Sequence, residues 1–136
     1  MGIFKYQLTI KPHHLDTLGH VNNSVYLQLF EEARWEILEG QGIGLDYVQQ
    51  SKTGPVILEM NLQFKAEVKN QERVTIHTET EPFQGKVCRL SQTLYNEKEE
   101  PACHVTMTCA VFDLERRKVI DPPQPWKKAL EADGAG

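Results

Sequence analysis

The residues best suited to chemistry lie in one short segment that begins at an acid. Asp16 is followed by a turn containing Gly19 and then by Asn22 and Asn23, two residues of a type that favours helix starts. The segment therefore predicts a carboxylate near the unpaired backbone N–H groups at the positive end of a helix. Such an arrangement can supply an anionic base or nucleophile and can hold the oxygen of a polarised carbonyl.

Each residue of this segment also has a structural interpretation, which the sequence leaves open. An aspartate before a helix is a common turn residue, so the catalytic interpretation of Asp16 depends on the whole segment. His20 is interpreted first as a structural histidine, the two asparagines first as helix caps, and Tyr26 equally as a core residue. The residues predicted to form an oxyanion hole or to position substrate are Gly19, His20, Val21, Asn22, Asn23 and Tyr26.

A long amphipathic helix must position this segment. Its predicted span is residues 22–39, ending near Gly40, and a second, short helix is predicted over residues 44–51. The apolar stripe of the long helix is predicted to run through Val25, Leu29, Ala33 and Ile37, with Tyr26, Phe30 and Leu38 beside it. Its charged, solvent-facing surface is predicted to comprise Glu31, Glu32, Arg34 and Glu36.

Alternating apolar residues predict an antiparallel sheet of about five strands. The strongest signal is the period of two over residues 56–68, where every even position is apolar, so one face of a long strand should be buried. The other predicted strands cover residues 3–11, 74–80, 86–96 and 103–113. One helix can cover only one face of such a sheet. A face or an edge is left for a second subunit, and we expect a homodimer.

The C-terminal part is predicted to be irregular. Residues 121–125, Asp-Pro-Pro-Gln-Pro, are predicted to be extended and non-helical, and the tail from about 128 to 136 to be flexible. No linker or repeat divides the sequence, so residues 1–136 are interpreted as a single domain.

Composition argues against several functional classes. A chain of 136 residues with 40% hydrophobic residues and a net charge of −4 predicts a folded domain rather than a general nucleic-acid binder. No apolar run reaches transmembrane length and no secretory signal is apparent, so we expect no membrane insertion and a cytoplasmic location. Cys88, Cys103 and Cys109 are interpreted as buried apolar residues in a reducing compartment. The histidines between residues 13 and 20 lack a second pair of ligands, so no metal site is predicted.

The chemically suited segment also carries a family pattern. It reads Asp16-x-x-Gly19-His20-Val21-Asn22-Asn23-x-x-Tyr26-Leu27, followed by Glu32-Ala33-Arg34, with Phe64-Lys65-Ala66 further on. This pattern resembles the signature of the hotdog-fold acyl-CoA thioesterases, in the 4-hydroxybenzoyl-CoA thioesterase-like group. The resemblance implies an α+β hotdog fold, in which a curved antiparallel sheet wraps round one long central helix. It also implies homodimers or homotetramers with active sites between subunits.

The resemblance further implies a reaction. An acyl-CoA thioester is hydrolysed without metal or other cofactor, with Asp16 as nucleophile or general base and the helix-start N–H groups as oxyanion hole. Relatives often carry a second acid two residues before the catalytic one, where this chain has His14, a difference that bears on substrate choice or pH optimum. The acyl group itself is not predicted. The alternatives are a non-catalytic acyl-CoA-binding hotdog domain and a hydroxyacyl-thioester dehydratase.

Two further groups of residues are candidates for contacts with substrate. Glu59 and Asn61 lie on the polar side of the long predicted strand and would reach a neighbouring subunit's site, although a solvated face is the simpler interpretation. Lys65, Lys86 and Arg89 would bind the phosphates of coenzyme A, although each is individually more often a surface charge.

Overall fold

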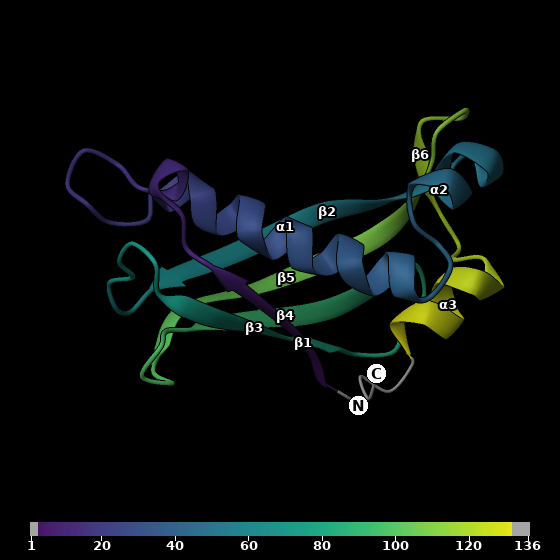
Figure 1. Cartoon of the computed structure of the whole chain (residues 1–136). Coiled ribbons are helices and arrows are strands. Elements are labelled where there is room, and N and C mark those ends of the chain that lie inside the picture. Colours follow the sequence, from purple (N-terminus) through teal and green to yellow (C-terminus); the bar gives the residue numbers. More distant parts are fainter. Residues whose placement is uncertain (1–2, 132–136) are drawn as a thin grey trace.

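The computed structural model describes residues 3–131, and Figure 1 shows one long helix lying across a curved sheet. The elements in chain order are β1 (Ile3–Thr9), η1 (Pro12–His14), α1 (Asn23–Gly40), α2 (Leu45–Ser51), β2 (Thr53–Phe64), β3 (Arg73–Thr80), β4 (Val87–Tyr95), β5 (Pro101–Asp113), β6 (Lys118–Ile120) and α3 (Gln124–Leu130). The predicted α+β class is confirmed, and the long elements other than β2 lie within about two residues of their predicted spans.

The sheet is antiparallel throughout, with the strand order β1-β3-β4-β5-β2 and β6 added beside the end of β5. It has six strands rather than about five, because residues 118–120 form a short strand that their length of three residues hides in the sequence. In this order β2 pairs only with β5 and forms a free edge of the sheet. The other edge of the sheet is β1, which pairs only with β3.

The long helix α1 begins one residue later than predicted. The side chain of Asn22 is the N-cap and accepts a hydrogen bond from the backbone N–H of Ser24 at 3.0 Å, so Asn23 is the first helical residue rather than a cap. A strict spacing of four drifts about 40° per step round an α-helix, so the predicted stripe leaves the sheet-facing side. The buried residues combine steps of three and four: Tyr26, Leu29, Phe30, Ala33 and Leu38.

The edge strand β2 differs from its prediction in position and in burial. It starts at Thr53 and ends at Phe64, and a bulge at Leu58 shifts its register against β5. On the predicted buried face, Leu58 is 50% exposed and Phe64 49% exposed. Met60 and Leu62 on the same predicted face pack against the core, so this face is buried only in part within one chain.

The central strands carry the main core. Val74 and Ile76 on β3, Leu94 on β4 and Val105 on β5 are fully buried under α1. The predicted burial of all three cysteines is confirmed, and all are free thiols. Cys88 and Cys109 lie directly opposite each other on β4 and β5, a proximity that their distance in sequence conceals.

The C-terminal predictions are wrong where the structure describes this region. Residues 124–130 form α3, so the segment 121–125 is not wholly extended and residues 128–130 belong to a helix. Pro125 falls in the first turn of α3, where no backbone N–H is needed. Trp126 is 1% exposed and donates from Nε1 to Thr53 Oγ1 at 3.0 Å. The remainder of the predicted tail, residues 132–136, lies outside the described residues.

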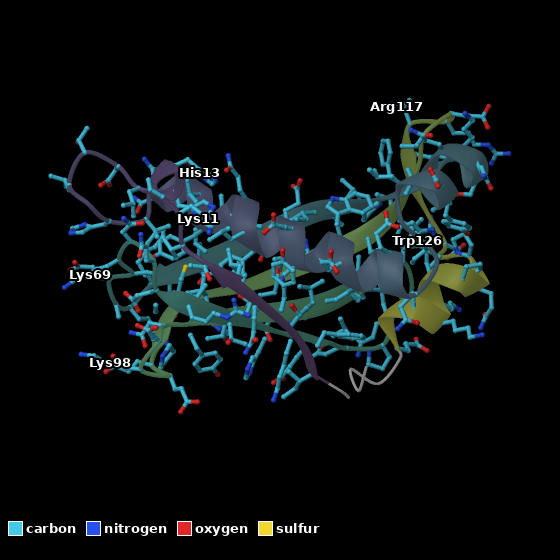
Figure 2. All side chains as sticks on the ribbon, in the orientation of Figure 1. Lys11, His13, Lys69, Lys98, Arg117 and Trp126 are labelled. Atoms are coloured by element: carbon cyan, nitrogen blue, oxygen red, sulfur yellow. The ribbon has the colours of Figure 1, made fainter. Side chains whose placement is uncertain are left out.

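Side chains divide clearly between the interior and the surface. Figure 2 shows Lys69 and Lys98 projecting outward from the loops at one end of the sheet, whereas Trp126 points inward at the other end. Trp126 belongs to a second apolar cluster, which joins the end of α1 to α3 and β5. The buried members of this cluster are Leu38, Ile43, Val111, Trp126 and Ala129.

Candidate active site

Asp16 lies in a closed turn just before α1. Its Oδ1 atom accepts hydrogen bonds from the backbone N–H groups of Leu18 at 2.8 Å and His20 at 3.3 Å. The turn is closed by bonds from Asp16 N–H to the His20 carbonyl and from Gly19 N–H to the Asp16 carbonyl. Gly19 has φ +83°, which explains a glycine at this position. The carboxylate is thus fixed through one oxygen, while no hydrogen bond from the described residues reaches Oδ2.

The N–H groups predicted to form the oxyanion hole are mostly engaged within the chain. Those of Gly19 and His20 bond to Asp16, that of Val21 donates to the Val68 carbonyl at 3.3 Å, and that of Asn22 donates to the His14 carbonyl at 3.3 Å. Among residues 19–23, only the N–H of Asn23 makes no hydrogen bond to the described part of the chain. Of the predicted oxyanion-hole donors, the N–H of Asn23 therefore remains available, at the positive end of the helix dipole.

The other predicted positioning residues have mainly structural surroundings. His20 Nε2 lies 3.5 Å from Glu67 Oε1, with both side chains about half exposed, and His20 reaches Asp16 through its backbone N–H. The Val21 side chain is buried in the core. Tyr26 is also buried, and its ring centroid lies 5.6 Å from that of Phe64. Burial raises the pKa of Tyr26 to about 12, so its hydroxyl stays neutral at physiological pH.

His14, which replaces the second acid of related sequences, is part of the same turn. Its Nδ1 accepts a hydrogen bond from the Lys11 N–H at 2.8 Å, and its carbonyl receives the Asn22 N–H. Burial and then the neighbouring His13 lower the pKa of His14, which favours a neutral ring at pH 7. The described residues contain no cluster of three or more side chains suited to hold a metal ion.

Glu59, Asn61 and Arg89 come together on the face of the sheet opposite α1. Glu59 and Arg89 both pair with Thr108 of β5, from its two sides, and all three residues line a polar trough of about 640 Å³. Glu59 and Asn61, which were predicted to reach a neighbouring subunit, thus lie beside Arg89, which was predicted to bind phosphate.

Lys65 and Lys86 are widely separated. The backbone N–H of Lys65 donates to the Ala102 carbonyl at one end of β5. Lys86 precedes Val87, which pairs with Ala110 near the other end of β5. Eight residues of an extended strand span roughly 26 Å. The three predicted phosphate-binding residues therefore do not form one basic cluster within a single chain.

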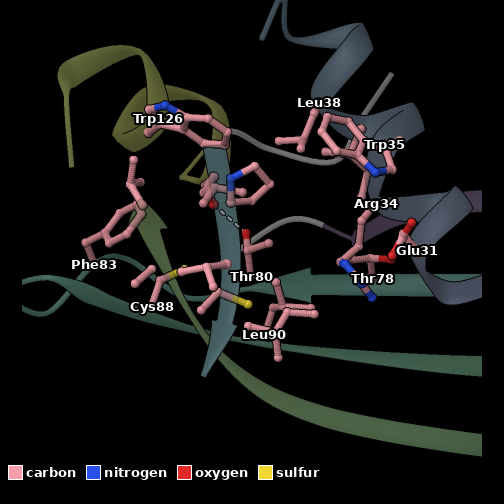
Figure 3. A pocket seen from close by; sticks show the side chains of 18 residues that line it. Glu31, Arg34, Trp35, Leu38, Thr78, Thr80, Phe83, Cys88, Leu90 and Trp126 are labelled. Carbon is pink, nitrogen blue, oxygen red and sulfur yellow. Dashed lines mark hydrogen bonds between the residues drawn. The ribbon is translucent and has the colours of Figure 1, made fainter. Parts of the chain in front are cut away.

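An apolar cavity of about 360 Å³ lies between the C-terminal half of α1, α3 and the sheet (Figure 3). Asp16 does not line it, nor does it line the polar trough. The apolar walls include Trp35, Leu38, Phe83, Leu90, Val111 and Trp126. A well-formed apolar pocket with few polar groups is the usual form of a site for an organic ligand.

The side chain of Arg34 points toward this cavity, so the prediction that Arg34 lies on the solvent-facing surface of the helix is wrong. Its Nη1 donates to Gln92 Oε1 at 2.9 Å, and the Gln92 amide donates to the Phe30 carbonyl and to Thr78 Oγ1, each at 3.0 Å. Gln92 is fully buried. A signal for this polar corner existed in the sequence, because Gln92 interrupts the apolar positions 88, 90 and 94 of a predicted strand.

The comparisons with known proteins agree with this geometry. A family model described as the thioesterase-like superfamily matches residues 10–130. The chain belongs to this superfamily. It is 28% identical over 126 residues to the long-chain acyl-CoA thioesterase FadM of Escherichia coli (strain K12), covering 92% of this chain and 95% of that protein. The predicted resemblance to the hotdog thioesterases and the prediction of a thioester hydrolase are confirmed.

Solved structures of thioesterases share the fold. The probable thioesterase YbaW from Escherichia coli superposes with a TM-score of 0.81 at 26% identity, covering 94% of this chain and 96% of that one. A 1,4-dihydroxy-2-naphthoyl-CoA thioesterase from Synechocystis superposes with a TM-score of 0.86 at 18% identity, covering 95% and 96%. At that identity the second likeness concerns the fold alone. As for membranes, none of the helices within residues 3–131 has the length and apolarity of a membrane-spanning segment.

Proposed function

We propose that the chain hydrolyses acyl-CoA thioesters, with Asp16 as the catalytic carboxylate and the N–H of Asn23 as an oxyanion donor. The observation that carries this proposal is the turn before α1. Two backbone N–H groups hold one oxygen of Asp16, while the other oxygen remains available. A fixed anionic oxygen beside a free helix N-terminus suits a reaction that develops negative charge on a carbonyl oxygen.

Two routes are consistent with this arrangement. In the first, Asp16 removes a proton from water while the water oxygen bonds to the thioester carbon. In the second, Asp16 itself attacks that carbon, and water then hydrolyses the mixed anhydride. In both, the carbonyl oxygen becomes an oxyanion held by N–H donors, the carbon–sulfur bond breaks, and the coenzyme A thiolate takes up a proton.

The site of this proposal includes a second copy of the chain. The free edge β2 exposes Leu58 and Phe64, two apolar side chains on a strand whose outer hydrogen-bonding groups have no partner in this sheet. Pairing of two β2 edges would cover these side chains and produce a homodimer, which can assemble further into a homotetramer. Glu59 and Asn61, on the same edge strand, would then lie at the junction between the two copies.

Replacing Asp16 by asparagine tests the catalytic assignment. The Asp16→Asn variant keeps a hydrogen-bond acceptor for the turn but has no anionic oxygen, so we expect kcat/KM for acyl-CoA hydrolysis to fall by about 10² to 10⁴ with little change in melting temperature. Asp46→Asn, at an exposed carboxylate in the first turn of α2, is the matched control and should hydrolyse at the wild-type rate. A folded Asp16→Asn variant with wild-type turnover would refute the assignment.

A further inference from the structure

The cavity under the C-terminal half of α1 combines apolar walls with one cation. Its lining is contributed by α1, α3, β3, β4 and β5 together with the start of β2, and its volume of about 360 Å³ falls within the usual range of ligand pockets. Figure 3 shows Arg34 extending from α1 toward the strand that carries Thr78, with Phe83 and Trp126 on the far side. Most of the surface that a ligand would meet is apolar, apart from this corner.

Most N–H donors of the Arg34 guanidinium group have no hydrogen-bond partner within the described residues. It carries five N–H donors, and its hydrogen bond within the described residues goes to the neutral Gln92 oxygen. No carboxylate of residues 3–131 lies within 4 Å of it, although Glu31 lines the same cavity from one turn earlier. Burial lowers the pKa of Arg34. Arg34 is partly exposed within this chain and lines the cavity, so its remaining N–H donors are accessible to a ligand that supplies an anionic or lone-pair oxygen.

Gln92 cannot take the place of that partner. Its amide group already donates to the Phe30 carbonyl and to Thr78 Oγ1, and its oxygen already accepts from Arg34. The hydrogen bonds of Gln92 are therefore all used within the chain, and the donors that remain available in this polar corner are N–H groups of the Arg34 guanidinium. An oxygen with negative charge or a lone pair is the complement of such donors.

We propose that this cavity receives the acyl group of the thioester and that Arg34 binds an oxygen substituent, a carboxylate or a hydroxyl, carried by that acyl group. The inference rests on the proposed function and adds a substrate class to it. An apolar cavity of about 150 Å³ holds one benzene molecule. At the same volume per carbon atom, about 25 Å³, this cavity of about 360 Å³ admits an acyl group of roughly fourteen carbon atoms or fewer.

The mouth of the cavity explains how such a group would reach Asp16. The exposed lining residues are Glu31 on α1 and Pro55 and Ile57 on β2, so the cavity opens beside the free sheet edge. Two β2 strands related by a two-fold axis pair antiparallel. The start of one β2 then lies near the end of the other, where Phe64 packs on Tyr26 at the start of α1. In such a pair, the carboxylate beside this mouth would be Asp16 of the second copy.

Matched substrates test the role of Arg34. Octanoyl-CoA is compared with its terminal carboxylate analogue suberoyl-CoA, and benzoyl-CoA with its 4-hydroxy derivative, by kcat/KM and by calorimetric Kd on the Asp16→Asn variant. We expect wild type to prefer the oxygenated member of at least one pair by roughly ten- to a hundredfold, as expected for a hydrogen bond to a charged group. Arg34→Met should abolish that preference while octanoyl-CoA is still hydrolysed, and Arg34→Lys should keep part of it.

The controls separate this inference from a structural role and from the proposed function. Arg116→Met, at a largely exposed arginine after β5, should leave the preference unchanged. If the Arg34→Met variant hydrolyses both members of a pair equally more slowly, Arg34 is purely structural and the inference is overturned. The inference is also overturned if neither wild-type hydrolysis nor binding to the Asp16→Asn variant shows a preference in either pair. Failure of the proposed function is recognised differently, because an Asp16→Asn variant would then match wild type on every substrate.

Discussion

The two ends of α1 have different surroundings, a polar turn at the start and an apolar cavity at the end. At its start, a turn of polar residues presents Asp16, held by backbone hydrogen bonds, and the neighbouring Leu18 is 76% exposed. At its end, α3 and the sheet close an apolar cavity around Arg34, and Trp126 is 1% exposed. A helix rises about 1.5 Å per residue, so roughly 17 Å of helix separates the start of α1 from Arg34.

Within one chain, this difference keeps the carboxylate proposed to be catalytic apart from the apolar cavity. A carboxylate that must stay ionised is best placed in a hydrated turn, whereas an acyl chain gains free energy from a dry cavity. A single helix cannot bring its two ends together, but two antiparallel copies can place the start of one helix beside the end of the other. The proposed site therefore requires a second copy of the chain.

The largest effect should follow from separating the two copies. Leu58→Lys places a charge on the exposed edge strand β2, so we expect a monomer by sedimentation and a loss of acyl-CoA hydrolysis of about a hundredfold or more, because the reacting groups are no longer positioned together. Leu45→Lys, at another exposed leucine on α2, should change neither property. A monomeric Leu58→Lys variant with full activity would place the whole site within one chain.

At the end of α1, a large change in stability should follow from loss of the tryptophan. Trp126→Ala removes a buried ring and its hydrogen bond to Thr53, and we expect the free energy of unfolding to fall by about 3–5 kcal/mol. Urea denaturation measures this change. Trp126→Phe should cost less, since it keeps most of the apolar volume. If Trp126→Ala unfolds at the wild-type urea concentration, α3 does not close the cavity.

At the start of α1, the corresponding change should be smaller. Asn22→Ala removes the side-chain acceptor for the Ser24 N–H, and we expect a loss of about 0.5–2 kcal/mol in the free energy of unfolding. Asn22→Ser, which can still cap the helix, serves as the control. A loss as large as that of Trp126→Ala would show that both ends of α1 are equally important to the core, contrary to the difference described above.

The smallest effect should be a loss of stability in mild acid. Burial lowers the pKa of both His14 and His77, whereas a histidine in the unfolded chain has a pKa near 6.5. Below about pH 6.5 the unfolded state therefore binds more protons than the folded state, and the free energy of unfolding should decrease as pH falls. Urea midpoints at pH 7.5 and 5.5 measure this slope, which should flatten in the His14→Gln, His77→Gln double variant.

Local patterns in the sequence predicted most of the fold. The helix from residue 23 to 40, its Asn22 cap and the short helix α2 follow from residues that are neighbours in sequence. Alternation likewise placed β3, β4 and β5 within a few residues. The predictions failed for α3 and for the exposed parts of β2, where Trp126 and the bulge at Leu58 depend on partners distant in sequence.

The candidate site was predicted in part. The position of Asp16 in a turn before a helix could be recognised from the sequence, whereas the number of free N–H groups could not, because the Val21 N–H bonds to Val68 and the Asn22 N–H to His14. Arg34 was assigned to the surface because it shares a helix with several glutamates. Its true direction is set by Gln92, which lies 58 residues further along the chain.

The sequence by itself determined the two helices α1 and α2 and the five longer strands to within a few residues, together with the Asn22 cap of α1 and the acid that precedes it. These features depend on periodicity and on side chains that bond to their own neighbours, which are physical effects of short range. Only the tertiary structure decided that β2 is a free edge, that α3 closes a cavity and that Arg34 turns inward. Those features depend on packing and hydrogen bonds between distant segments, which no local pattern encodes.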